Sequence, residues 1–196
     1  MIEFQGNSFG GTLLILECGN IAVNGGGTLA DMEEAYIVDG EKPMAMIVTC
    51  EHHHRSHNVD RFCLKHNVPL ITTTLCANQL ALEGVNTTLL TVPESKLFVK
   101  LGFGISLIPV RYDSVEPFFL TVNDGNEQIG IVPDGKIYPD LAKYLFDCDT
   151  VILYTPLDIP GNVAPSALAR RLQSVYNTWD ELDEIFKNYD GELYYI

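Results

Sequence analysis

The chain has 196 residues, of which 46% are hydrophobic and 19% charged, and its formal net charge is −14. These values are typical of a folded globular protein and exclude a disordered chain. The length predicts a single domain over residues 1–196. The apolar runs are too short to span a bilayer and no signal peptide is visible, so we expect a cytoplasmic protein without a membrane partner. The negative charge disfavours a nucleic-acid surface, because phosphates would be repelled.

The five cysteines are scattered along the chain without a CxxC pair (Cys18, Cys50, Cys63, Cys76 and Cys148). An odd number at such spacing indicates reduced thiols and not a disulfide framework. All of them except Cys50 are expected to be small buried hydrophobic residues.

The N-terminal part of the chain predicts a hairpin. Residues 12–16 and 20–24 are short apolar runs on either side of Cys18-Gly19, a pattern that favours antiparallel strands. The Gly25–Gly27 stretch that follows lacks the spacing of a phosphate-binding loop, so a turn is favoured over a phosphate cradle.

The middle of the chain predicts strands and helices in turn. A helix is expected to begin at Ser56 or Asn58. Predicted strands cover residues 45–49, 69–73, 88–92 and 105–110, with a short helix at 75–82. The strand at 45–49 is apolar over its first four residues and ends at a histidine-rich segment, so we expect it to be buried.

The last third predicts a hairpin and then further alternation. The predicted elements are strands at 118–122 and 129–132 around an Asn-Asp-Gly-Asn turn, helices at 138–146, 165–176 and 179–189, and a strand at 151–154. The last helix has an apolar face (Trp179, Leu182, Ile185 and Phe186), for which packing onto a sheet is favoured over a partner site. Together these elements predict a layered α/β protein with mixed sheets.

The densest chemistry lies in residues 48–57, Val-Thr-Cys-Glu-His-His-His-Arg-Ser-His. Four of the five histidines lie there within six positions, directly after an apolar strand. A loop at a strand end can aim several imidazoles at one metal ion. Taken alone, the segment fits a solvated polar loop equally well.

This segment resembles the metallo-β-lactamase-fold motif T-H-x-H-x-D-H. In that alignment Thr49 matches, Cys50 takes the place of the first histidine, and His52 matches the second. His54 stands at the aspartate and Arg55 at the third histidine. The resemblance is to the phosphodiesterase and exonuclease branch of the superfamily.

Other segments resemble the same family in order and spacing. Residues 109–117 are similar to P-V-x-H-D-A-x-E-P, with Tyr112 where a metal-binding histidine belongs. Residues 130–135 are similar to the strand that ends in the bridging aspartate, and Asp134 keeps that residue. Asn24 replaces an aspartate at the end of the second hairpin strand.

The resemblance covers about residues 7–160 and implies a trimmed four-layer αββα sandwich with mixed sheets. Near residues 154–158, where the family has its last metal-binding histidine, this chain has none.

The departures change the chemistry that the resemblance implies. Working members hold two metal ions and a hydroxide, but only His52 and Asp134 keep a ligand at the expected position, too few for a catalytic zinc. Arg55 is permanently charged and has no lone pair for a metal. We therefore expect an Arg55–Asp134 ion pair in place of the metal centre, because a buried lone carboxylate is costly.

Two catalytic alternatives remain open. Cys50, His52, His54 and Asp134 could form a rebuilt single-zinc site in a phosphodiesterase-like hydrolase, with the thiolate favouring zinc over magnesium. Cys50 could instead act as a nucleophile beside the histidines.

The favoured interpretation is a non-catalytic protein without a cofactor. Its cleft would be lined by His52, His54, Arg55, Tyr112 and Asp134, and would bind a small anionic, nucleotide-like ligand. A protein partner fits equally well, either a second copy in a homodimer or an active paralogue.

Overall fold

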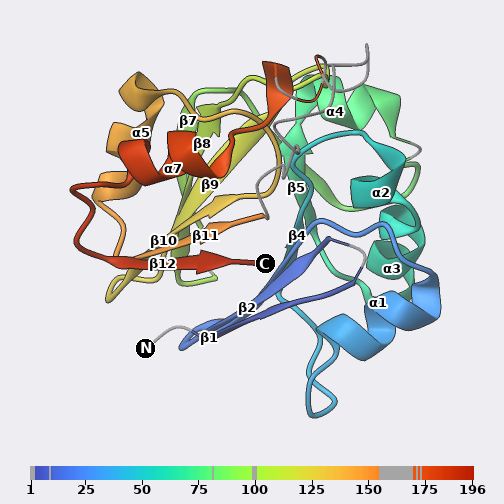
Figure 1. The fold of residues 1–196 in the computed structure, drawn as a ribbon. Helices are drawn as coiled ribbons and strands as arrows, with labels where there is room; N and C mark the ends of the chain where they lie inside the picture. Colours follow the sequence, from blue (N-terminus) through green and yellow to red (C-terminus); the bar gives the residue numbers. More distant parts are fainter. Residues whose placement is uncertain are drawn as a thin grey trace.

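Two six-stranded mixed sheets face each other, and helices cover the outer face of each (Figure 1). The computed structural model describes residues 3–8, 10–80, 82–98, 101–154, 170, 172 and 174–196. The arrangement is the four-layer αββα sandwich with mixed sheets that the sequence predicts.

The first sheet contains its six strands in chain order: β1 (Glu3–Gly6), β2 (Thr12–Leu16), β3 (Gly19–Val23), β4 (Ala45–Ile47), β5 (Leu70–Thr73) and β6 (Thr87–Leu90). The predicted hairpin is confirmed, because β2 and β3 pair antiparallel from Thr12–Val23 to Leu16–Gly19. From β3 onward the neighbours are parallel. Helices therefore connect these strands: α1 (Leu29–Tyr36), α2 (His53–Ser56), α3 (Val59–His66) and α4 (Thr74–Gln79).

The second sheet runs in the order β12 (Glu192–Tyr195), β11 (Thr150–Leu153), β10 (Gln128–Val132), β9 (Phe118–Asn123), β8 (Phe103–Pro109) and β7 (Glu94–Phe98). The predicted hairpin of β9 and β10 is confirmed, and its turn has Gly125 at φ +96°. Strands β10, β11 and β12 are parallel, with α5 (Pro139–Phe146) and α7 (Trp179–Ile185) on the outer face.

Alternation along the strands builds the three apolar layers. In β4, Ala45 and Ile47 point into the core between the sheets, while Met46 points outward beneath α1 and α3. Successive strand side chains point to opposite faces, so a strand buried on both faces is apolar throughout. On the outer face of the second sheet, Leu145 of α5 and Leu182 of α7 pack in a third cluster.

Several elements differ from those expected. Strands β1, β7 and β12 and helix α1 are not among the predicted elements. The three strands lie at sheet edges, and only Met32 and Tyr36 of α1 are buried. The predicted last helix ends at Ile185 instead of Tyr189, with Leu182 and Phe186 buried and Trp179 40% exposed. Much of the predicted helix at 165–176, and residues 155–158, lie outside the described residues.

The cysteine expectation is wrong at one position. Cys18 is exposed in the turn between β2 and β3, whereas Cys50, Cys63, Cys76 and Cys148 are buried, all as free thiols. Within the described ranges, no helix combines the length and apolar content needed to cross a membrane.

Candidate functional site

The histidine-rich segment is held against the glycine stretch that follows β3. The backbone nitrogen of Gly25 donates to the carbonyl of Arg55 at 2.6 Å, and that of Gly26 to the carbonyl of His57 at 3.2 Å. Gly26 has φ +110°, and a Cβ there would lie 2.0 Å from the His54 carbonyl oxygen. These glycines therefore act as a platform for α2, which agrees with the predicted turn.

Asn24 fixes the other end of the segment. Its carboxamide oxygen accepts from the backbone nitrogen and the hydroxyl of Thr49, each at 3.0 Å. Asn24 itself has φ +62°, in the left-handed region that asparagine tolerates. The residue that replaces an aspartate thus joins the ends of β3 and β4, where the functional loop begins.

The ion pair predicted between Arg55 and Asp134 is present and buried. Arg55 Nε lies 2.5 Å from Asp134 Oδ2, and Nη2 lies 3.0 Å from Oδ1. The side chains are 8% and 6% exposed, respectively. This two-point contact matches the fork of a guanidinium to the two oxygens of a carboxylate.

Backbone oxygens take the other donors of Arg55. Nη2 donates to the carbonyl of Pro133 at 3.0 Å, and Nη1 donates to the carbonyl of Gly10. The guanidinium carbon lies 4.5 Å from the ring centroid of Tyr154. Four of the five N–H groups of a guanidinium are thereby used inside the protein.

Two phenols complete the surroundings of Asp134. Tyr176 donates to Asp134 Oδ1 at 3.2 Å, and its oxygen lies 3.0 Å from that of Tyr112. Since the Tyr176 proton is used on Asp134, Tyr112 donates to Tyr176. Burial, and then the Asp134 carboxylate, raise the pKa of both tyrosines, so the phenols stay protonated and able to donate at neutral pH.

The two histidines of the predicted cleft lie beside this pair. His52 stacks on His54 with ring centroids 5.7 Å apart and meets Tyr112 edge-on at 5.1 Å. His52 Nε2 lies 3.1 Å from the Asp113 carbonyl, and His54 Nε2 lies 3.9 Å from Asp134 Oδ2. Burial, and then the Arg55 charge, lower the pKa of His54, which favours its neutral form at pH 7.

Cys50 lies three residues beyond the end of β4 and is buried, with 1% of its surface exposed. Burial raises the pKa of its thiol to about 12, with a smaller contribution from the Asp134 charge. A thiol of this kind is protonated at neutral pH, whereas a cysteine nucleophile acts as a thiolate.

The donor set does not fit a metal centre. Across the parts of the chain that the structure describes, no three His, Cys, Asp or Glu side chains come together in a group able to hold a metal ion. Arg55 occupies both oxygens of Asp134, and its charge would repel a divalent cation. The cavity that Asp134 lines encloses only about 20 Å³.

All five residues of the predicted cleft come together, although they belong to three separated segments. Partners that sequence reasoning missed are Gly10, Tyr154 and Tyr176, which contact Arg55 or Asp134. They carry no recognisable motif. A signal existed only for Tyr154, which follows the apolar strand at 151–153.

Two facing mixed sheets with helices on their outer faces, and a histidine-rich segment directly after β4, are features of the metallo-β-lactamase fold. This chain has that fold. No family model matches the sequence, and no curated protein does either.

Three similar solved structures have low sequence identity to the chain. The metallo-β-lactamase fold protein YhfI from Bacillus subtilis has a TM-score of 0.66 at 14% identity, over 95% of this chain and 88% of that one. Igni18, a metallo hydrolase from the archaeon Ignicoccus hospitalis, has a TM-score of 0.65 at 12% identity, over 100% and 94%. The short form of human tRNase Z has a TM-score of 0.62 at 15% identity, over 95% and 88%. At such low identities the structural similarity shows the fold alone.

Proposed function

We propose that this chain is a non-catalytic protein of the metallo-β-lactamase fold that acts by binding, with the Arg55–Asp134 ion pair in place of a metal centre. The observation that carries the proposal is the two-point contact between these side chains, both less than 10% exposed. A hydrolytic metal pair needs carboxylate and imidazole lone pairs directed at the ions. Here the carboxylate lone pairs point at a guanidinium.

The sequence predicts either a small anion or a protein as the binding partner. The geometry around Arg55 favours a protein partner over a small anion. The charge of Arg55 is neutralised by Asp134, and four of its donors are bound to protein oxygens. His54 is accessible, with its side chain 56% exposed, but its lowered pKa leaves little positive charge at pH 7. Such a surface offers a phosphate few charge-assisted hydrogen bonds. We propose a second copy of the chain or an active paralogue as the partner, within the cytoplasm.

The alternative is a zinc-dependent phosphodiesterase with Cys50, His52, His54 and Asp134 as ligands. One solved structure of this fold, PqqB from Methylobacterium extorquens, is described as Zn²⁺-bound. In this chain the same role would require displacement of Arg55 from both oxygens of Asp134. That change opposes metal binding, because it breaks a buried ion pair.

The test is metal content and turnover in the same tag-free preparation. We expect less than about 0.1 equivalent of zinc per chain by mass spectrometry after dialysis against micromolar zinc. We also expect hydrolysis of bis(4-nitrophenyl) phosphate at the background rate with Zn²⁺ or Mn²⁺ added.

The control separates a specific site from surface binding. Asp134→Asn removes a proposed ligand, and Asp140→Asn makes the same change at an exposed position of α5. One equivalent of zinc together with turnover, both lost in Asp134→Asn and kept in Asp140→Asn, would overturn the proposal.

A further inference from the structure

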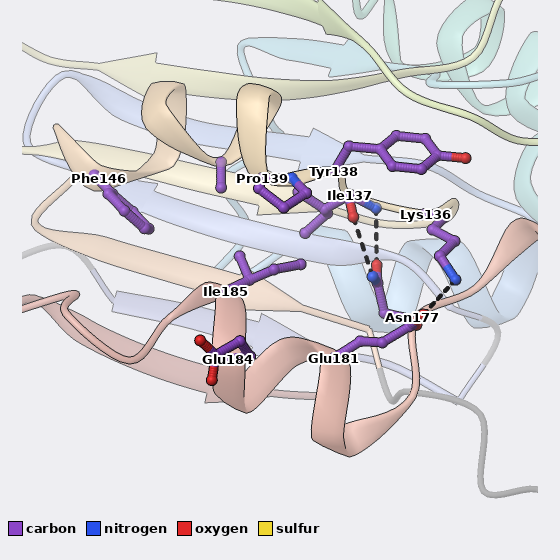
Figure 2. A pocket seen from close by; sticks show the side chains of 10 residues that line it. Lys136, Ile137, Tyr138, Pro139, Phe146, Asn177, Glu181, Glu184 and Ile185 are labelled. Carbon is purple, nitrogen blue, oxygen red and sulfur yellow. Dashed lines mark hydrogen bonds and ion pairs between the residues drawn. The ribbon is translucent and has the colours of Figure 1, made fainter.

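A cavity lies between α5 and α7, on the outer face of the second sheet and apart from the Arg55–Asp134 pair. It encloses about 640 Å³, within the range of small-molecule sites. Figure 2 shows its lining: the two helices form the walls, and the segment that leads into α5 forms one end. None of its ten lining residues belongs to the cleft predicted from the sequence.

The walls are preformed. The Asn177 amide is 5% exposed and bonds twice to the backbone of Ile137, accepting from its nitrogen at 2.8 Å and donating to its oxygen at 3.1 Å (Figure 2). A capping box between Thr178 and Glu181 fixes the start of α7, and Pro139 opens α5. The helix ends that frame the cavity are therefore held by hydrogen bonds that involve no ligand.

One end of the cavity is apolar. Phe146 of α5 lies at this end and is 38% exposed, and Ile185 of α7 points into the cavity from the opposite wall (Figure 2). Phe146 is held by ring contacts to Phe186 and Tyr189, each with centroids 6.1 Å apart. An exposed aromatic side chain that is fixed in this way suits the apolar body of a ligand.

The charged residues of the lining differ in whether they already form close ion pairs or hydrogen bonds within the protein. Lys136 Nζ lies 2.6 Å from Glu181 Oε1, and Glu181 Oε2 accepts from the backbone of Thr178 at 3.0 Å. Among the residues that the structure describes, Glu184 has only a distant contact, 3.7 Å from Lys187, between side chains that are 78% and 65% exposed. Such a surface pair is worth little, so the Glu184 carboxylate can accept a ligand cation.

We propose that this cavity binds a small amphipathic cation, with its apolar body against Phe146 and Ile185 and its ammonium group at Glu184. The lining carries two carboxylates against one ammonium, and the whole chain has a net charge of −14. Both the local and the long-range fields therefore attract cations and repel anions of the same shape.

The experiment compares two probes with one ring system. Tryptamine carries an ammonium group, and indole-3-propionate carries a carboxylate on a side chain of similar length. We expect tryptamine to bind saturably in an amide NMR titration, with shifts at the lining residues, and about tenfold more tightly than indole-3-propionate.

Matched variants on one helix decide the role of Glu184. Glu184→Lys should weaken tryptamine about tenfold, whereas Asp183→Lys makes the same change of charge at an exposed neighbour outside the cavity and should have little effect. Phe146→Ala should weaken both probes. Equal affinity for the two probes, equal effects of the two lysine variants, or no saturable shift at the lining residues would each overturn the proposal. None of these outcomes depends on whether the Arg55 site is catalytic.

Discussion

Cys50 has the sequence context of a nucleophile and the surroundings of a core residue. It precedes the histidine cluster, yet it is 1% exposed and its thiol has a pKa of about 12. Nucleophilic cysteines lie in electropositive, accessible sites where the thiolate is stabilised. Burial at the end of β4 outweighs the nearby Arg55 charge, so the residue behaves as a small hydrophobe.

Alkylation measures this difference directly. With limiting iodoacetamide at pH 8, we expect Cys18 to be labelled first and Cys50 to react more than about 100-fold more slowly, because reaction requires both access and ionisation. Peptide mass spectrometry of the native protein gives both rates, and labelling after unfolding in urea is the control. Labelling of Cys50 as fast as Cys18 would restore the cysteine-nucleophile hypothesis.

At the scale of elements, the loop that carries the site depends on close backbone approach. Helix α2 has only four residues and could not be stable alone. Its position is set by backbone hydrogen bonds from Gly25 and Gly26 to the carbonyls of Arg55 and His57. This approach requires glycine, since a side chain at Gly26 would meet the His54 carbonyl.

Gly26→Ala should therefore destabilise the protein by about 2–3 kcal/mol, from the positive φ and from the displaced α2 backbone. Urea unfolding followed by circular dichroism provides the measurement. The matched control is Gly125→Ala, at φ +96° with nothing within 4 Å of the added Cβ, where strain alone should cost about 1–2 kcal/mol. Equal losses for the two variants would show that the approach to α2 contributes nothing.

At the scale of the whole molecule, Arg55 joins segments that belong to both sheets. It extends from α2 beside the first sheet and contacts the carbonyl of Gly10 before β2. It also contacts Pro133 and Asp134 just after β10 of the second sheet, 78 and 79 residues away. A cation at this position can hold the two halves together through directed hydrogen bonds.

Removal of one partner should leave a buried unpaired charge. We expect Arg55→Met to lower the free energy of unfolding by about 3–5 kcal/mol. Adding Asp134→Asn to it should cost less than the sum of the two single changes, by about 1–3 kcal/mol. The comparison pair is Lys187→Met with Glu184→Gln, an exposed ion pair at 3.7 Å, for which coupling near zero is expected. A single-variant loss below about 1 kcal/mol would contradict the bridging role.

Local sequence patterns were enough for most of the framework around the site. The β2–β3 and β9–β10 hairpins, the strand before the histidines and α5 follow from apolar runs, turn residues and spacing, which act over a few neighbours. The strands β1 and β7 escape prediction because their sequences, Glu-Phe-Gln-Gly and Glu-Ser-Lys-Leu-Phe, contain few apolar residues, and β12 has only four residues. The opposite charges of Arg55 and Asp134, together with the resemblance that placed both at one site, also predicted that they would pair.

The tertiary structure alone decided which segments surround the Arg55–Asp134 ion pair and where a cavity forms. The carbonyl of Gly10 and the phenols of Tyr154 and Tyr176 reach the ion pair from segments far apart in the chain, and no short-range pattern encodes those contacts. The cavity between α5 and α7 likewise exists only once both helices pack on one sheet. Sequence thus determined which groups the chain carries and the order of its elements. Folding determined which charges are neutralised and which remain available, because desolvation and pairing depend on neighbours in space.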